Sequence, residues 1–346
     1  MLHPSQSRLE DLIMHSHLYD SSPLHAHAHP SPSTMGSAPS ISRRMLLAAG
    51  GFLATTLLGR RELAIAQDHP LWSSEVTIYT QGNWRYIVSN GIPNHVTGVF
   101  PNQNNPNTIS PQRYRFQVAA RPQIADQITP NPLGTFGVAI NGVTFDPGAA
   151  EFWRGDRSWQ YEALSGQINL GLDGNNAHVQ PSGAYHYHGL PMGLLANLGD
   201  GRRMLLLGYA ADGFPIYAQY GYVNPADPAS GVKKMRSGYQ LKQGRRPNNG
   251  PGGAYDGTFG QDYEFVGAGD LDECNGRFGV TPEYPDGVYH YYITERFPTI
   301  SRNFRGVPST SFRRSPADRQ SPPGRPQTPL PDLHPPNRPR RPPTSD

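Results

Sequence analysis

The sequence FGVAINGVTF, residues 136–145, gives the clearest local indication of the fold. Two runs of apolar and β-branched residues flank the pair Asn141-Gly142. Asn-Gly is the favoured pair for the two-residue type I′ turn of a β-hairpin, because that turn needs a positive φ at both central positions. The stretch therefore predicts two antiparallel strands joined at Asn141-Gly142.

Short segments of the same kind recur between residues 75 and 294, separated by turn-forming sequences such as NGIPN, PNQNNPN and NPADPAS. Many alternate with a period of two, as strands do, whereas helical periodicity is scarce. WQYEAL (159–164) and PMGLLANLG (191–199) are the segments that could each form a short helix. We expect a mainly β domain, sandwich-like or a distorted barrel, with long loops and one or two short helices.

The N-terminal 66 residues have the organisation of an export signal preceded by an extension. An arginine pair at 43–44 precedes an apolar run over 45–58 and an A-x-A cleavage pattern at 64–66. This layout is typical of a twin-arginine signal, and its apolar run is shorter than the roughly 20 residues that span a bilayer. We expect residues 1–66 to be removed, leaving a periplasmic or secreted protein without a transmembrane segment. An ordinary secretory signal and an uncleaved anchor are the alternatives.

Six of the 13 histidines precede Met35, and three of them form the motif HAHAH. They could make a metal-binding tail. Met35 would, however, give the signal an n-region of ordinary size, and we therefore prefer the interpretation that these histidines are untranslated or removed with the signal.

From Arg305 onward the chain is rich in proline and arginine and nearly free of aliphatic residues. Such a segment buries too little apolar surface to offset its ordering entropy, so we expect residues 306–346 to be a disordered tail and residues 67–305 to form one domain. From Arg305 the chain carries eight arginines and three aspartates, or +5, against +3 for the whole chain. The folded part is therefore mildly acidic, which excludes nucleic acid as an expected partner.

Three histidines fall within eleven residues in HVQPSGAYHYHG, residues 178–189. In a strand, His186 and His188 point to the same face with their Cα atoms about 6.5–7 Å apart, so their imidazoles could share one metal ion. His178 could fold back beside this pair through the turn at residues 181–183. The tyrosines of the motif would lie on the opposite face, packing the core and offering hydroxyls to orient a ring nitrogen.

The stretch GVYHYYI (287–293) is a partial repeat of this motif. His290 occupies the equivalent place in the repeat and could come from a neighbouring strand. The candidate metal ligands are therefore His186, His188, His178 and His290, together with His95. Imidazole ligands suit zinc or copper better than magnesium or calcium. The alternative is that each histidine is a hydrogen-bonded core or surface residue.

Other polar motifs have structural explanations. Asp270, Asp272 and Asn275 offer oxygens for calcium, but the spacing of an EF-hand loop is absent, and a loop anchor is the preferred role. Asp212-Gly213 is typical of a turn. No G-x-S-x-G, HExxH, phosphate loop or G-x-G-x-x-G follows a predicted strand, so enzymatic activity is left open.

Several motifs together resemble the YHYH domain family of exported bacterial and some eukaryotic proteins. They are SNGIPNHVTGVFPNQNNPN (89–107), HVQPSGAYHYHG (178–189), GYAADGFPIY (208–217) and DLDECNGRFGVTPEYPDGVYHYYITERFP (270–298). The likeness covers roughly residues 75–306. The tetrad that names the family falls on Tyr185, His186, Tyr187 and His188, and the other positions that carry over are His95, His178, Asp212, Asp272, Glu273, Cys274, Asn275 and His290.

The resemblance implies no settled activity. It does imply a second cysteine near Asn303, which this chain lacks, so that its single cysteine, Cys274, would have lost a disulfide partner. Two functions remain open: an exported protein that binds a transition metal and is catalytic or not, or a non-catalytic envelope module whose aromatic loops bind a carbohydrate, a small molecule or a partner protein. Nothing in the sequence sets the oligomeric state.

Overall fold

The structure is a computed structural model that describes residues 72–313. The predicted export signal and residues 314–346 lie outside the described residues. The prediction of a mainly β fold is confirmed, and within residues 72–313 the one α-helix is α1 (Met192–Leu198), in one of the two segments predicted to be helical. No helix in the described range has the length and hydropathy needed to cross a membrane.

The other helical prediction, over residues 159–164, was wrong. Gln160 and Tyr161 instead make isolated β-bridges to Phe152 and Phe259. The Tyr161 ring also packs 4.7 Å from the Phe259 ring, measured between centroids. This segment is therefore fixed by pairing with Phe152, a few residues earlier, and with Phe259, about a hundred residues later, which a local helical pattern does not report.

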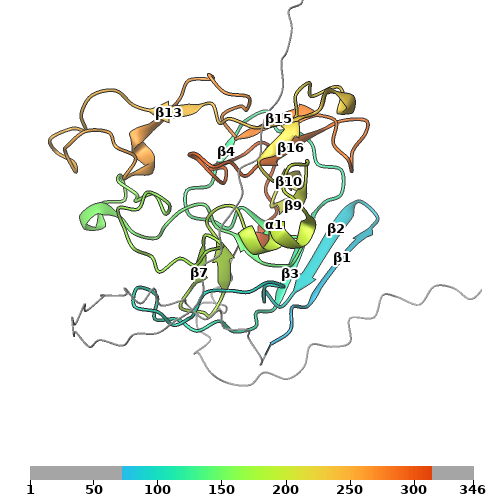
Figure 1. Ribbon diagram of the computed structural model, residues 1–346, viewed down its shortest axis with the longest axis horizontal. Coiled ribbons are helices and arrows are strands. Elements are labelled where there is room, and N and C mark those ends of the chain that lie inside the picture. Colours follow the sequence, from blue (N-terminus) through green and yellow to red (C-terminus); the bar gives the residue numbers. More distant parts are fainter. Residues whose placement is uncertain (1–71, 314–346) are drawn as a thin grey trace, which may run out of the picture. The chain divides into compact units, whose positions relative to one another are not determined.

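The largest element is an eight-stranded mixed sheet, several of whose strands lie side by side in Figure 1. Its strands, in spatial order, are β15 (Gly276–Gly279), β16 (Val288–Tyr292), β10 (Pro215–Tyr217), β9 (Leu206–Ala210), β5 (Gly137–Ala139), β6 (Thr144–Phe145), β8 (Tyr185–Tyr187) and β7 (Ala177–Val179). The terminal strands β15 and β7 do not pair with each other, so the sheet is open and not a closed barrel.

The two halves of this sheet repeat one arrangement. In the first half the hairpin β5–β6 is followed by β8, parallel to β6, and by β7, antiparallel to β8. In the second half the hairpin β9–β10 is followed by β16, parallel to β10, and by β15, antiparallel to β16. The halves meet where β5 pairs with β9. The pairing registers make His186 equivalent to His290. His186 lies opposite Thr144 in β6. His290 lies opposite Pro215 in β10, one residue before the pair Ile216–Tyr291.

The loops that precede β7 and β15 confirm this equivalence atom by atom. The Oδ1 of Asp173 accepts the N–H groups of Asn175 and Ala177, and the Oδ1 of Asp272 accepts those of Cys274 and Gly276. Each aspartate then binds a tyrosine hydroxyl, from Tyr185 in the first half and from Tyr289 in the second. Asn176 and Asn275, the third residue after each aspartate, both have a positive φ, of 53° and 55°. The repeat in the sequence is thus a repeat in the fold.

The predicted hairpin at residues 136–145 forms, but its turn differs from the type I′ prediction. Gly142 has a φ of 84°, whereas Asn141 is not among the residues with positive φ. The pairing closes from Ala139 N–H to the Val143 carbonyl, which leaves a three-residue loop, and such a loop needs a positive φ only at its last position. The Asn141 side chain is then available to donate a hydrogen bond to the Tyr187 hydroxyl at 3.0 Å.

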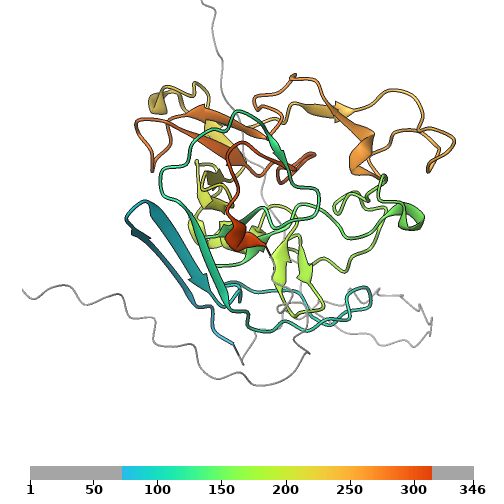
Figure 2. The ribbon, with the colours of Figure 1, turned by 180° about the vertical axis from the view of Figure 1, so that it is seen from behind.

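A second sheet of three antiparallel strands consists of β1 (Val76–Gln81), β2 (Trp84–Ser89) and β3 (Tyr114–Ala119). Figure 2 shows these strands in blue and teal, apart from the larger sheet. Ile87 and Phe116 on this sheet belong to the same buried apolar cluster as Val138 and Ile216 on the eight-stranded sheet. The two sheets therefore share one core, which agrees with a sandwich-like packing.

Smaller elements complete the described chain. They are the pairs β11 (Tyr220–Tyr222) with β12 (Val232–Lys234), β13 (Tyr239–Leu241) with β14 (Tyr263–Phe265) and β17 (Asn303–Phe304) with β4 (Thr129–Pro130), and the 3-10 turns η1 (Trp153–Gly155), η2 (Pro228–Ser230), η3 (Gly260–Asp262) and η4 (Thr310–Phe312). The predicted tail begins at residue 306, yet the packed chain continues past it: Phe312 is buried and stacks on Phe116 at 4.3 Å between ring centroids.

Candidate metal centre

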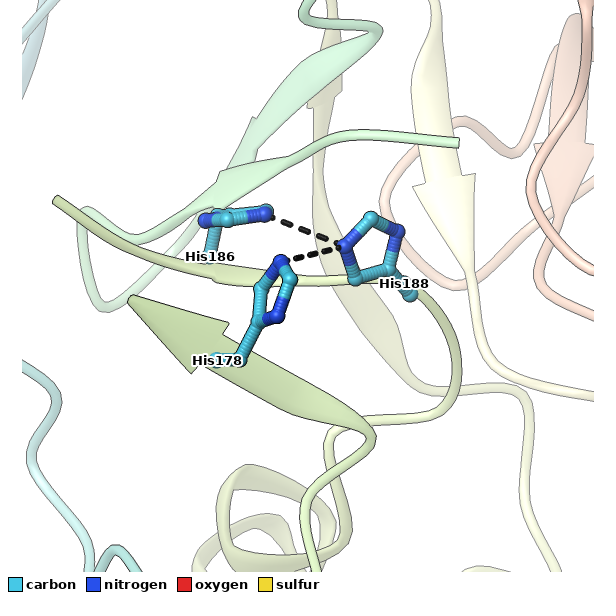
Figure 3. A group of neighbouring side chains, drawn as sticks. All are labelled: His178, His186 and His188. Atoms are coloured by element: carbon cyan, nitrogen blue, oxygen red, sulfur yellow. Dashed lines mark hydrogen bonds between the residues drawn. The ribbon is translucent and has the colours of Figure 1, made fainter. Parts of the chain in front are cut away.

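Three histidines from the hairpin β7–β8 lie on one face of the sheet. The register places His178 opposite His186, and His188 follows His186 by two residues. Residues directly opposite or two apart in extended strands share a face. Figure 3 shows the three rings converging. His186 and His188 are buried, and His178 is partly exposed, which leaves the cluster one side that faces solvent.

The spacing of the ring nitrogens suits a single ion. The Nε2 of His188 lies 3.1 Å from the Nε2 of His186 and 3.1 Å from that of His178. Candidate ligand atoms of all three residues lie within 4.8 Å of one another. Two nitrogens bound at about 2.0–2.1 Å to a tetrahedral ion are separated by about 3.3 Å. The cluster therefore has the dimensions of a metal site.

The backbone fixes the tautomers of two of these rings. The Nδ1 of His178 lies 2.8 Å from the Leu170 carbonyl oxygen, and the Nδ1 of His186 lies 3.2 Å from that of Ala184. A carbonyl can only accept, so each Nδ1 must carry the hydrogen and each Nε2 must present a lone pair. A ring oriented by a carbonyl on its other nitrogen is the usual arrangement of metal-binding histidine.

Hydrogen bonding alone does not satisfy the three rings when all are neutral. The Nε2 of His188 can donate one hydrogen, to His178 or to His186, and the remaining lone pair then faces another nitrogen. Burial, followed by the neighbouring His186, His178 and Arg302, holds the pKa of His188 well below its usual range. The ring is thus kept neutral, which is the form that coordinates a metal.

The tyrosines of the tetrad lie on the opposite face of β8, as the alternation predicts. Tyr187 packs against Phe145, with ring centroids 5.5 Å apart, and its hydroxyl donates to the Nε2 of His95 at 2.6 Å. Tyr185 donates to Asp173 at 2.6 Å. A tyrosine hydroxyl thus reaches a ring nitrogen, as predicted, but the ring is that of His95. The rings of His178 and His186 are oriented by backbone carbonyls.

His95 and His290 lie outside the three-histidine group. The ring of His95 is engaged at both nitrogens, by the Val96 carbonyl and by Tyr187 behind the sheet. His290 is in β16, and four strands of the sheet separate it from β8. At about 4.8 Å per strand this places the two strands roughly 24 Å apart along the sheet. The equivalence that the partial repeat suggested is present, but it relates the two ends of the sheet and not two neighbouring strands.

The second half of the sheet shows what the same position looks like without the cluster. There, Arg277 stands opposite His290, where His178 stands opposite His186, and Tyr292 stands in the place of His188. The hydroxyl of Tyr292 donates to the Nε2 of His290 at 2.8 Å, while the Nδ1 of His290 faces the Val288 carbonyl at 2.9 Å. Both nitrogens of His290 are therefore satisfied, whereas the lone pairs in the first half converge on one another.

The acidic motif and Asp212 anchor local structure. Asp272 holds the loop described above, and Asp270 accepts from Lys233 at 2.7 Å. Asp212 accepts hydrogen bonds from the hydroxyl of Tyr291 at 2.5 Å and from the N–H of Gly306 at 2.9 Å. These partners agree with the anchor and turn roles preferred from the sequence, and no ring nitrogen of the cluster is involved.

Three polar residues that were not predicted from the sequence lie beside the cluster on the histidine face: Thr144, Asp146 and Gln180. Thr144 lies opposite His186 in the parallel register, Asp146 follows it by two residues, and Gln180 follows His178 by two. The period-2 spacing of Gln180 from His178 was a usable signal. The placement of Thr144 and Asp146 required knowledge of the pairing between β6 and β8.

These features define a mainly β protein with a largely buried three-histidine cluster at one end of an open sheet. Residues 115–306, more than half of the chain, match a family model described as YHYH protein, so the chain belongs to the YHYH protein family. The tetrad of the family name supplies two of the three clustered histidines. No curated protein and no solved structure shows significant similarity to the chain.

Proposed function

We propose that this chain is an exported metal-binding protein whose centre is formed by His178, His186 and His188. The observation that carries the proposal is the convergence of three Nε2 atoms, two of which must present lone pairs because their Nδ1 atoms face backbone carbonyls. The second half of the sheet supports it, since the equivalent His290 has a hydroxyl donor on its Nε2.

The donor set favours zinc or copper. All three ligands are imidazoles, and in the described residues no carboxylate or thiol joins the group. Calcium and magnesium prefer oxygen ligands, whereas imidazole suits zinc and copper. A transition metal held by three imidazoles can polarise a bound oxygen ligand as a Lewis acid, so the proposal is compatible with a catalytic role.

Metal analysis of the purified full-length protein tests this function. We expect close to one zinc or copper ion per chain in the wild-type protein, and loss of that ion in the His186→Ala/His188→Ala variant with the circular dichroism spectrum retained. The matched control is His290→Asn, which changes a buried histidine outside the cluster and should leave the metal content unchanged. Equal metal content in the double variant and the wild type would exclude the centre.

Export by the twin-arginine pathway is part of the same proposal and is supported by the arginine pair at 43–44 and the A-x-A pattern at 64–66. The pathway carries folded proteins, so a metal could be loaded before export. Replacing both arginines by lysine should retain the uncleaved precursor in the cytoplasm. Cell fractionation and the mass of the protein, which reports cleavage of the signal, would show this. Unchanged processing of that variant would argue for another export route.

A second candidate function rests on exposed aromatic side chains of the three-stranded sheet. Trp84 is 45% exposed, and Tyr79 stacks on Tyr86 at 5.1 Å between ring centroids. Exposed aromatic faces are typical of surfaces that bind carbohydrates or partner proteins. Glycan-array binding that persists after EDTA treatment and is lost in Trp84→Ala would favour this non-catalytic role over the metal-dependent one.

A further inference from the structure

Buried polar atoms without hydrogen-bond partners gather around the three-histidine cluster. In the described residues they include the Oγ1 of Thr144 and the Oε1 of Gln180. The Thr144 residue is only 3% exposed. Native proteins rarely leave such atoms unpaired, and an ordered water or bound ligand is a usual explanation.

The register places these atoms on the face that carries the ring nitrogens. Phe145 and Tyr187 touch behind the sheet, so their neighbours Thr144 and His186 share the front face. The side chain of Gln180 donates from Nε2 to the Oδ2 of Asp146 at 2.8 Å. Gln180 follows β7 and Asp146 follows β6, and β8 lies between these strands. This bridge therefore crosses β8 on the side of His186.

The fold itself does not require these polar residues. The registers make Pro215 the counterpart of Thr144 and Tyr217 the counterpart of Asp146, and Gly279 the counterpart of Gln180. The second half forms the same strands with proline, tyrosine and glycine at these three positions. The positions of Thr144 and Gln180 are thus polar only in the half that carries three histidines, which points to a role linked to the cluster.

The protein supplies three ligand side chains and no fourth. In residues 72–313 no aspartate, glutamate or cysteine has an atom close enough to join the group formed by His178, His186 and His188. Structural zinc sites are closed by four protein ligands, whereas sites with three protein ligands keep a position for water or substrate. The fourth position is the place where an outside ligand would meet the unpartnered polar atoms.

We infer that the proposed metal keeps one coordination position open toward Thr144 and Gln180, and that this position takes water or another oxygen ligand with a hydrogen to donate. The inference rests on the proposed function, because it requires the ion. The Oε1 of Gln180 can only accept, and the Asp146 carboxylate beside it offers acceptor oxygens, so the surroundings favour a ligand that donates a hydrogen bond. Hydroxyl-bearing substrates and water share this chemistry.

Cobalt substitution of the full-length protein tests the inference without an assay of activity, with azide as the probe of the open position. The visible spectrum of cobalt(II) reports its ligands, and we expect azide to change it saturably. Gln180→Leu and Thr144→Val each remove a hydrogen-bonding partner of the resident oxygen ligand, so each should tighten azide binding by about 2–10-fold at unchanged cobalt stoichiometry. Gln219→Leu is the matched control, because Gln219 also has a buried, unpartnered Oε1 but follows β10 in the second half.

The outcomes separate the two proposals. Failure to bind cobalt would overturn the metal centre and the inference with it. Stoichiometric cobalt with a spectrum that saturating azide leaves unchanged would retain the metal centre and show that its fourth position is closed. Azide binding of equal strength in the wild type, Gln180→Leu and Thr144→Val would show that these side chains do not face the open position.

Discussion

His186 and His290 occupy equivalent positions in the two halves of the eight-stranded sheet, yet their Nε2 atoms meet opposite kinds of partner. The Nε2 of His290 accepts from the hydroxyl of Tyr292, and the Nε2 of His186 faces another imidazole nitrogen, that of His188. The Nδ1 of each ring faces the carbonyl two residues earlier in its strand. One scaffold therefore holds a satisfied histidine at one end and a cluster of lone pairs at the other.

His188→Tyr should give His186 the same hydrogen-bond partner that His290 has in the second half of the sheet. The new phenol would donate to the Nε2 of His186 as Tyr292 does to His290, removing one ligand and occupying the lone pair of another. Changing a residue that only hydrogen-bonds a metal ligand lowers metal affinity by about 10–100-fold. We expect a larger loss here, measured by competition with a chromophoric chelator. His188→Gln, a smaller change, separates loss of the ligand from misfolding. Wild-type affinity in both variants would contradict the assignment of His188 as a ligand.

Arg277→His with Tyr292→His should create a second cluster around His290. The two replacements reproduce the positions of His178 and His188, and the Nδ1 of His290 is already held by the Val288 carbonyl. We expect the metal content to rise from one ion toward two per chain, by elemental analysis and calorimetric titration. The single variants serve as controls and should remain near one. A double variant that folds but stays at one ion would show that the ring positions alone are insufficient.

Asp212 should make stability depend on pH between about 4 and 6. Burial raises its pKa from 3.8 to about 6. Because the folded-state pKa is the higher one, its contribution is fully present below pH 3.8 and is lost as the pH rises through 6. The shift corresponds to about 3 kcal/mol in the free energy of unfolding. In urea unfolding from pH 4 to 7, the free energy of unfolding of the wild type should fall by about this amount relative to that of Asp212→Asn.

Asp212→Asn is a suitable comparison because the first half already carries an amide at this position. Asn141 is the counterpart of Asp212 and bonds the hydroxyl of Tyr187, the counterpart of Tyr291. The variant should therefore keep a hydrogen bond to Tyr291 without a titrating group. A constant difference in unfolding free energy between the two proteins across this range would refute the role of Asp212.

Cys274 should be unreactive in the folded protein. The residue is fully buried, and burial, followed by the nearby Asp272 and Glu273, raises the pKa of its thiol to about 12. The thiolate is the reactive form, so modification by a disulfide reagent at pH 8 should require unfolding. Asn303, at the position where the family resemblance implied a second cysteine, donates to the carbonyl of Glu273 at 3.2 Å and so lies beside this loop. Rapid labelling under native conditions would show that the loop opens readily.

The sequence on its own determined what depends on near neighbours in the chain. Alternation placed His186 and His188 on one face and their tyrosines on the other, and Asn-Gly located the hairpin at residues 136–145. Ordered motifs identified the family, and the partial repeat predicted the equivalence of His186 and His290. These inferences hold because the period of a strand and the geometry of a turn are set within a few residues.

Only the tertiary structure decided which strands pair and in what register. The parallel pairing of β6 with β8 brought Thr144 beside His186, and the order of the sheet put four strands between β8 and the strand that carries His290. Pairing also replaced the predicted helix at 159–164 by contacts with Phe259. Strand order follows from burying a common apolar core across long separations in sequence, and no local pattern encodes that choice. The three-histidine cluster could therefore be anticipated, whereas the polar residues that surround it could not.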